Sequence, residues 1–374
     1  MDNKNLFGNL LKNEGMFQAS DIVQEMALKV PQYNKFYSTS PTMSWGSAVG
    51  YMPGMMELLY GPKSSGKTMI VLDRIKQAQK EPDTIQIFID AELGFEYEST
   101  IRWMAANGVD TTRILVIREV CIKRIFEHHL LNIIQKELLA GNIKVNYSCL
   151  DSVQATSVAA IPKTEAQIKK AVKDDSYTKQ DYGARANYLS RIFPAFRMFC
   201  RDYRIFHTFI GQARDGGKDF KGNIIWTTNG GESLYHEVQY RTLVTPWGEP
   251  VYSETMGATG KPVKIGHRVK FKFEKNKAGE GHDREGFCDI EYMKGIVNTE
   301  NELLVLGSKL GIIEQAGAWY IYEGTKCNGG AKFIEHLKSD RDMYDQIFSE
   351  IMMAASSRPD QEITYDEETG EIEE

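Results

Sequence analysis

Between residues 55 and 210 the chain alternates short apolar runs with longer stretches of helical periodicity. The apolar runs have the length and residue types of buried strands, and they cover 55–59, 85–89, 114–117, 145–150 and 205–210. The stretches 69–79 and 122–139 carry apolar residues at the spacing of amphipathic helices. Because alternating strands and helices form a mainly parallel sheet covered by helices on both faces, we predict an α/β fold.

The pattern changes before and after this core, which we place at 46–297. Residues 1–45 form a separate start, in which a helical stretch at 20–29 is ended by Pro31. We therefore predict an N-terminal helical segment that is distinct from the core.

A third region follows the core. Helical patterns surround a short strand at 319–322, which predicts a small C-terminal α/β domain over 298–356. The last residues, 357–374, are polar and acidic, and they predict a disordered tail.

Two long polar stretches interrupt the alternation of strands and helices. Residues 163–181 are rich in Lys, Asp, Ser, Thr and Gln, and residues 213–231 are rich in Gly, Lys and Asn. Both follow predicted strands at their carboxyl ends, where open α/β sheets place ligand sites. Because loops of this length in a compact domain are usually functional or disordered, we treat both as candidate ligand-binding loops.

The composition, with 42% hydrophobic and 26% charged residues, is typical of a globular protein. No run of about 18 apolar residues occurs, and residues 1–9 lack the apolar centre of a signal sequence. We therefore expect a cytoplasmic protein without membrane contact. The five cysteines have no CxxC spacing, which argues against a zinc site or a disulfide framework.

The net charge of −6 is unevenly distributed. Eight acidic residues and no basic ones lie between Asp360 and Glu374, which leaves about +2 on the rest of the chain. The overall charge argues against a protein that simply coats DNA with a basic surface. A nearly neutral body can still carry basic loops that contact nucleic acid.

One segment matches the phosphate-loop pattern GxxxxGK[ST] completely. It consists of Gly61, Pro62, Lys63, Ser64, Ser65, Gly66, Lys67 and Thr68. A strand is predicted before it and a helix after it, so successive backbone N–H groups and the helix N-terminus would face a phosphate. Lys67 would supply a charge to the terminal phosphates, and Thr68 a hydroxyl to Mg²⁺. The sequence therefore predicts that the protein binds ATP and Mg²⁺.

Three polar residues follow other predicted strands at the same sheet edge. Asp151 is a candidate Mg²⁺ ligand, although an Asp at this place also makes a good helix N-cap. Glu92 is a candidate for orienting the attacking water, with a solvated loop acid as the alternative and Asp90 as a competing, more structural position. Gln212 is a candidate for sensing the γ-phosphate, with a strand-capping amide as the alternative.

In this order, these residues resemble the RecA-like recombinases. The resemblance extends to further segments, namely 88–92, 151–153, 227–231, 274–277 and 313–320, the last of which reads Ile-Glu-Gln-Ala-Gly-Ala-Trp-Tyr. It covers roughly residues 38–374 and includes the acidic tail. It implies an ATP-dependent recombinase that polymerises on single-stranded DNA and catalyses homologous pairing and strand exchange in recombination and repair.

The chain departs from the family pattern in several places. Gly211 stands where the family has Asn, residues 163–181 do not align well, and additional residues occur between Glu92 and Gly108 and around 246–264. This divergence resembles a bacteriophage recombinase of the UvsX type. The resemblance also implies a homo-oligomeric helical filament, in which residues 1–45 serve oligomerisation, and partners that include double-stranded DNA and single-strand-binding and loader proteins.

In this family two loops hold DNA, and the second corresponds to 213–231. Arg214, Lys218 and Lys221 would contact phosphates, and the backbone at Gly230 and Gly231 would approach DNA closely. Phe220 is the candidate for stacking on bases, with Trp226 as a second aromatic residue, and the alternative is that both rings pack beneath the loop. After the first loop, Arg185 is the basic residue that matches best, unless it is a solvated helical charge. These DNA-binding residues are the ones that the resemblance implies.

The resemblance also implies that Lys275 and Lys277 reach the γ-phosphate of a neighbouring subunit. The two lysines alternate on a predicted strand and would share one face, although an exposed polar strand face has the same pattern. For stacking on adenine, Trp103 and Tyr97 are both candidates, and we prefer Trp103.

Two other functions compete with the recombinase. One is a hexameric replicative DNA helicase of the same core fold, and the other is a non-catalytic, ATP-gated recombination mediator. The segment 313–320 and the paired lysines argue against the helicase. The complete set of Lys67, Thr68 and Glu92 argues against the mediator.

Overall fold

The computed structural model describes residues 35–48, 50–95, 97–158, 166, 169, 183–218, 220, 224–228, 232–248, 251–256, 262–279 and 284–356. The fold below is that of the unit that begins at Phe36. The helix predicted at 20–29, most of the first polar stretch at 163–181 and the acidic tail lie outside the described residues.

A ten-stranded sheet forms the centre of the fold. In spatial order its strands are β12 (Gly295–Val297), β11 (Glu285–Glu291), β10 (Gly266–Asn276), β7 (Tyr240–Pro246), β1 (Met56–Gly61), β5 (Phe206–Lys218), β4 (Val145–Asp151), β2 (Ile85–Asp90) and β3 (Ile114–Ile117), while β6 (Ile224–Thr228) pairs only with β5. The strands from β7 to β3 are parallel, which confirms the predicted α/β core. The pairs that β10 forms with β7 and β11, and that β11 forms with β12, are antiparallel.

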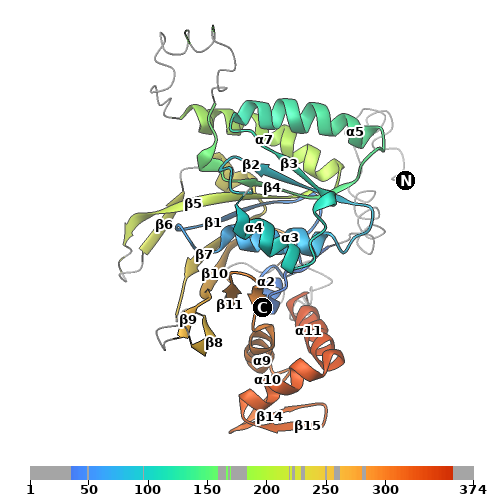
Figure 1. The fold of residues 1–374 in the computed structure, drawn as a ribbon, viewed down its shortest axis with the longest axis vertical. Coiled ribbons are helices and arrows are strands. Elements are labelled where there is room, and N and C mark those ends of the chain that lie inside the picture. The colour runs from blue at the N-terminus through green and yellow to red at the C-terminus, as the bar shows by residue number, and fades with distance from the viewer. Residues whose placement is uncertain are drawn as a thin grey trace, which may run out of the picture. The chain divides into compact units, whose positions relative to one another are not determined.

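Helices cover both faces of the sheet (Figure 1). α3 (Lys67–Ala78) and α4 (Glu98–Ala106) bury their apolar residues on one face, in a cluster that includes Ile70 and Trp103. η5 (Arg124–Ile134), α5 (Gln135–Leu139), α7 (Ala184–Asp202) and α8 (Glu232–Glu237) lie on the other face. The helix predicted at 122–139 is present, with π-helical hydrogen bonding over η5.

Two polar residues inside β4 have buried partners in the neighbouring strands. Asn146 accepts a hydrogen bond of 3.0 Å from Gln86 of β2, and the Ser148 hydroxyl lies 2.6 Å from Nδ1 of His207 on β5. Because a buried polar group is costly unless it is hydrogen-bonded, these contacts explain how a less apolar strand occupies the middle of the sheet.

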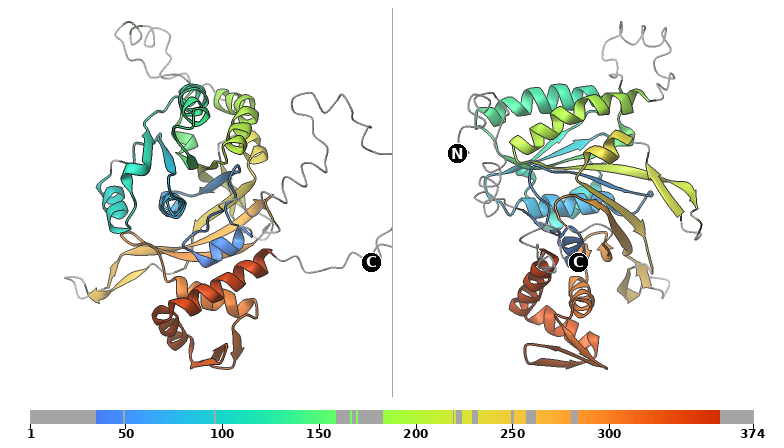
Figure 2. Two further views of the ribbon diagram at one scale, coloured as in Figure 1. Left: turned by 90° about the vertical axis from the view of Figure 1, so that its right-hand side faces the viewer. Right: turned by 180° about the vertical axis from the view of Figure 1, so that it is seen from behind.

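The second polar stretch is a hairpin rather than the loop that the sequence predicts. β5 is buried in its first half and continues as an exposed strand to Lys218, where it pairs antiparallel with β6. The two strands extend away from the central sheet (Figure 2). A second, smaller hairpin is formed by β8 (Tyr252–Met256) and β9 (Pro262–Lys264).

The last described residues form a compact cluster of their own, with an apolar centre that includes Leu303, Phe333 and Ile347. Its elements are α9 (Thr299–Lys309), β13 (Glu314–Ala316), β14 (Trp319–Tyr322), β15 (Thr325–Asn328), α10 (Gly330–Ser339) and α11 (Arg341–Ser356). The short helix α2 (Pro41–Gly46) packs against this cluster through Trp45. Thr111–Arg113 (η4) and Val153–Ala155 (η6) are single 3₁₀ turns. Among the described residues, no helix is long and apolar enough to cross a membrane.

Candidate nucleotide site and the exposed hairpin

The phosphate loop connects the buried strand β1 to helix α3. Gly66 precedes the helix with φ at +81°, a conformation that L side chains rarely adopt. At Gly61 an added Cβ would lie 1.9 Å from the carbonyl oxygen of Val244, so a side chain has no room there. Both glycines of the motif are thus required by the backbone, as the sequence pattern predicts.

Lys67 points back over its own loop. Its ammonium group donates to the carbonyl oxygens of Gly61 at 3.0 Å and Pro62 at 2.7 Å. Burial lowers the pKa of Lys67 to about 8, against the opposing effect of the carboxylates of Asp151 and Glu92. A phosphate at the loop would favour the charged form of this lysine.

The Thr68 hydroxyl donates to the Asp151 carboxylate over 2.9 Å. Asp151 ends β4 and is only 7% exposed. Burial, together with the neighbouring carboxylate of Glu92, raises its pKa to about 7. A hydroxyl and a carboxylate at this spacing fit Mg²⁺, which is held by one or two carboxylates together with substrate phosphates.

Glu92 follows β2, beside Asp151. It is exposed to the cavity, and the Ser152 hydroxyl donates to its carboxylate. Asp90 is 1% exposed, and it accepts hydrogen bonds from the backbone N–H groups of Gly94 at 2.9 Å and Phe95 at 3.0 Å. Of the two acids, Asp90 therefore shapes the loop, and Glu92 is the one that faces the nucleotide site.

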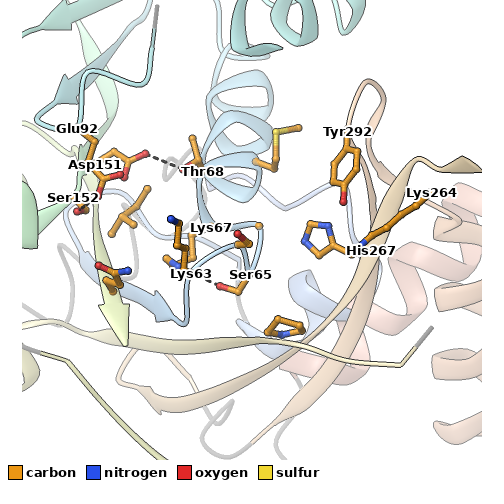
Figure 3. A pocket seen from close by; sticks show the side chains of 16 residues that line it. Lys63, Ser65, Lys67, Thr68, Glu92, Asp151, Ser152, Lys264, His267 and Tyr292 are labelled. Atoms are coloured by element: carbon orange, nitrogen blue, oxygen red, sulfur yellow. Dashed lines mark hydrogen bonds between the residues drawn. The ribbon is translucent and has the colours of Figure 1, made fainter. Parts of the chain in front are cut away.

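These groups line one cavity of about 600 Å³ around the phosphate loop (Figure 3). Glu92, Asp151 and Ser152 lie on one side of Lys67, and His267, Tyr292 and Lys264 lie on the other. The remaining lining residues are Lys63, Ser64, Ser65, Gly66, Thr68, Met69, Ile210, Gln212 and Pro246. The structure thus brings together the phosphate loop and the three polar residues predicted at other strand ends.

The prediction that Trp103 stacks on adenine is wrong. Its side chain is 1% exposed and lies in the core, where an added Cβ on Gly295 would be 2.9 Å from the indole ring. Trp103 is also not among the residues that line the cavity. Tyr97, the other candidate in sequence, is 63% exposed.

An aromatic surface on the cavity comes instead from β10 and the residue after β11. The rings of His267 and Tyr292 are 5.8 Å apart with an angle of 40° between their planes. Tyr292 is 45% exposed, and burial lowers the pKa of His267. These two residues were missed in the sequence, since only the antiparallel extension of the sheet brings them to the phosphate loop.

Gln212 lies on β5 at the edge of the cavity, paired in register with Gly61. Its backbone N–H donates to Oε1 of Gln154 over 2.9 Å. Gln154 lies in the turn η6, directly after the Asp151 strand, and it belongs to no motif that the sequence analysis identified.

The paired lysines lie at the end of β10. The strand has an irregularity between Phe273 and Lys275 and ends at Asn276, so Lys277 lies just past the strand. Lys275 donates to the carbonyl oxygens of Tyr235 at 3.0 Å and His236 at 2.8 Å, and burial lowers its pKa to about 8. Neither lysine lines the cavity of its own chain.

The hairpin of β5 and β6 carries the predicted DNA-binding side chains. Arg214 and Lys218 are exposed, and Phe220 at the tip is 96% exposed. Trp226 packs instead against the apolar cluster on the face of the sheet that η5 and α7 cover. Of the two aromatic residues, Phe220 is the one that solvent or a ligand can reach. The predicted contacts of Lys221, Gly230 and Gly231 lie outside the described residues.

Arg185 makes a structural contact with the backbone, and its predicted phosphate contact stays a prediction. Its Nη1 donates to the carbonyl oxygens of Val153, Gln154 and Thr156 at 3.1–3.3 Å, and burial lowers the pKa of its guanidinium. It therefore fixes the turn after Asp151 to the start of α7.

Comparisons with known proteins agree with this arrangement. Residues 9–297 match the RecA N-terminal domain family, and residues 301–356 match the RecA C-terminal domain family. The protein named "Protein RecA" from Streptococcus mutans is 30% identical over 307 residues, which are 80% of this chain and 71% of the relative. "Protein RecA" from Streptococcus gordonii is 29% identical over 329 residues, 87% of this chain and 78% of the relative.

Proposed function

The chain belongs to the RecA family of recombinases, and from that premise we propose that it is a DNA-dependent ATPase whose ATP state controls a filament on single-stranded DNA. The proposal rests on one observation: acidic residues at the ends of two neighbouring strands, β4 and β2, lie in the same cavity as the phosphate loop. The Thr68 hydroxyl lies 2.9 Å from the Asp151 carboxylate, and Glu92 faces the same cavity. A site that only binds a nucleotide needs the phosphate loop, whereas hydrolysis also needs a residue such as Glu92 that can orient water.

Each residue around the loop has a distinct part in hydrolysis. Thr68 and Asp151 would hold Mg²⁺, which neutralises phosphate charge when it is bound. Lys67 leaves its carbonyl partners to pair with the terminal phosphates. Glu92, held by Ser152, orients the attacking water and accepts its proton.

The nucleotide base takes the opposite end of the cavity. We place adenine against Tyr292 and His267, because this aromatic pair is the part of the lining that offers a flat surface. Tyr97 stays a second candidate, since it is exposed and precedes α4.

Lys275 and Lys277 complete the site from a neighbouring subunit. They do not line the cavity of their own chain, and they lie at a strand end from which long, cationic side chains can reach outward. ATP would then act as a contact between subunits, so that hydrolysis weakens the filament and releases DNA. Residues 1–45 supply further oligomerisation contacts, and the filament also binds double-stranded DNA during exchange.

DNA lies along the hairpin of β5 and β6. Arg214, Lys218 and Lys221 neutralise phosphates, Phe220 stacks on or between bases, and the backbone at Gly230 and Gly231 approaches the strand. Support comes from the exposure of Arg214, Lys218 and Phe220. A bacteriophage origin, contacts with single-strand-binding and loader proteins, and competition of the acidic tail with DNA all stay predictions.

Electron microscopy with circular single-stranded DNA and a non-hydrolysable ATP analogue tests the proposal. Open helical filaments on the circles are expected, and Lys67→Ala should form far fewer of them. Closed rings would instead indicate a hexameric helicase. DNA binding that neither polymerises nor responds to the analogue would indicate a non-catalytic mediator.

A further inference from the structure

The side-chain amide of Gln154 connects the nucleotide cavity to the hairpin. Its Oε1 accepts from the backbone N–H of Gln212 over 2.9 Å, and its Nε2 donates to Oγ1 of Thr228 over 2.6 Å. The orientation of the amide is fixed by its partners, because a backbone N–H can only donate and therefore requires the amide oxygen. The Gln154 amide thus accepts a hydrogen bond from β5 and donates one to β6.

Gln154 is held firmly on the side of the Mg²⁺ ligand. It lies three residues after Asp151, in the turn η6, and Arg185 donates to the carbonyl oxygens of this turn, including that of Gln154 itself. The turn is further closed by the Thr156 hydroxyl, which donates to the Val153 carbonyl over 2.7 Å. A shift at the end of β4 is therefore transmitted to the Gln154 side chain.

Thr228 is held just as firmly on the hairpin side. It is the last residue of β6 and 9% exposed, and its backbone N–H donates to the Tyr235 hydroxyl over 3.0 Å. The Tyr235 carbonyl in turn accepts from Lys275 at 3.0 Å. A chain of hydrogen-bonded residues thus runs from Gln212 through the base of the hairpin to the lysine proposed to act across the subunit interface.

The neighbouring Gly211 makes room for this connection. A Cβ at Gly211 would lie 3.0 Å from Leu58 and 3.3 Å from the Thr228 hydroxyl, closer than nearly all real Cβ contacts. The absence of a side chain on β5 therefore lets Thr228 pack against the strand at the point where Gln154 reaches it.

We propose that Gln154 is a positioning residue that couples nucleotide binding at Gln212 to the DNA affinity of the hairpin. This inference rests on the proposed function. A γ-phosphate that attracts the Gln212 side chain moves its backbone N–H, and Gln154 passes the movement to Thr228. Coupling between two sites of one protein typically changes affinity by about 5- to 150-fold, and a bridging residue should carry a measurable part of it.

The test measures the affinity for a fluorescently labelled single-stranded oligonucleotide by anisotropy, with ADP and with a non-hydrolysable ATP analogue. Gln154→Met keeps the length of the side chain and removes both hydrogen bonds. We expect the ratio of the two dissociation constants to fall by about fivefold or more. Gln79→Met is the matched control, because Gln79 also uses both amide atoms, here toward the backbone of Asp110, far from the hairpin in sequence.

Thr228→Val supplies a second variant, which removes only the acceptor of the Gln154 amide. Its ratio should fall to a similar extent, and the double variant should be no worse than either single one, because both changes break the same connection. Trp226, two residues before Thr228 on β6, is one of the five tryptophans, and its signal is the part of the fluorescence that Trp226→Phe removes. Its fluorescence should respond to the analogue in the wild type and lose that response in Gln154→Met.

The outcomes separate this inference from the proposed function. If the wild type shows no dependence of DNA affinity on nucleotide, the proposed function fails. If the wild type shows it and folded Gln154→Met or Thr228→Val keeps the full ratio, the role of Gln154 is overturned. Additive losses in the double variant would likewise overturn it, since they would mean that the two residues act separately.

Discussion

Thr68 and Asp151 are joined by a hydrogen bond of 2.9 Å between hydroxyl and carboxylate, which ties the first turn of α3 to the end of β4. The two residues are 83 positions apart in the sequence. Their contact places the carboxylate where a cation between it and the phosphates would be bound.

The affinity for Mg²⁺-ATP should depend on pH in both directions. Mg²⁺ requires the ionised form of Asp151, whose pKa is raised to about 7, so affinity should rise as the pH approaches 7. Phosphate prefers the charged form of Lys67, whose pKa is lowered to about 8, so affinity should fall above pH 8. Calorimetric titrations from about pH 5.5 to about pH 9 should show a maximum between these values.

Asp151→Asn separates the contribution of Asp151 to the pH dependence of Mg²⁺-ATP affinity from that of Lys67. The variant should lose the rise on the acidic side, keep the fall on the alkaline side and bind Mg²⁺-ATP at least about tenfold more weakly.

Without nucleotide, the stability of the fold should depend on pH in the opposite sense to the affinity. A raised carboxyl pKa stabilises the fold at low pH, and that contribution is lost as the pH rises through about 7. Asp151→Asn should therefore gain stability over the wild type in urea unfolding at pH 8 but not at pH 4. If Asp151→Asn kept the rise in Mg²⁺-ATP affinity on the acidic side, the role of Asp151 would be contradicted.

Glu92→Gln should slow hydrolysis without preventing nucleotide binding. Loss of a general base typically reduces turnover by about 10²- to 10⁴-fold, and the Ser152 contact can be kept by an amide oxygen. Single-turnover measurements should show slow chemistry with an ATP dissociation constant within about threefold of wild type. Glu98→Gln is the control, since Glu98 is exposed and pairs with Arg102 within α4. Normal turnover in Glu92→Gln would exclude Glu92 as the base.

Tyr292→Ala should weaken nucleotide binding, whereas Trp103→Ala should lower the stability of the fold. Removing Tyr292 should weaken ATP binding by about 5- to 150-fold, the range expected for loss of base stacking, and leave the fold intact. Removing Trp103 should cost about 3–5 kcal/mol of stability, because the side chain is fully buried. Thermal unfolding and nucleotide titration together check both expectations. If Tyr292→Ala binds ATP normally, the base lies elsewhere, with Tyr97→Ala as the next variant to measure.

Mixtures of two inactive variants test the role of the paired lysines. Lys67→Ala removes the charge at a subunit's own phosphate loop, and Lys275→Ala combined with Lys277→Ala removes the charges given to its neighbour. Each variant alone should lack DNA-stimulated hydrolysis. Mixed filaments contain some interfaces with both sets intact, so the activity of the mixture should exceed that of either variant. A mixture as inactive as its components would refute a contribution across the interface.

The sequence predicted the parallel half of the fold well. β1 and β2 are mostly apolar strands that are recognisable without knowledge of their partners, and β4 keeps enough apolar residues around Asn146 and Ser148 to be recognised too. The phosphate loop was equally clear, because its pattern is local. Asp151 and Glu92 could be placed as well, since the carboxyl ends of parallel strands meet at one edge of the sheet.

The antiparallel pairing of β10 and β11 was not predicted, although a strand was expected at Lys275. β10 alternates between buried and half-buried residues, and the exposed end of β5 is held by pairing with β6 rather than by burial. Trp103 was therefore mistaken for a ligand contact, whereas its partner Gly295 lies on a strand that the pattern did not reveal. Gln154 was missed because its hydrogen-bond partners, Gln212 and Thr228, are distant from it in sequence.

The most direct test of the account is a strand-exchange assay between circular single-stranded DNA and homologous linear duplex DNA. The wild type with Mg²⁺ and ATP should produce joint molecules, and Lys67→Ala should produce almost none under the same conditions. A heterologous duplex should give none with either protein. Joint molecules formed equally well by Lys67→Ala, or a wild type that hydrolyses ATP without pairing homologous strands, would contradict a recombinase driven by this site.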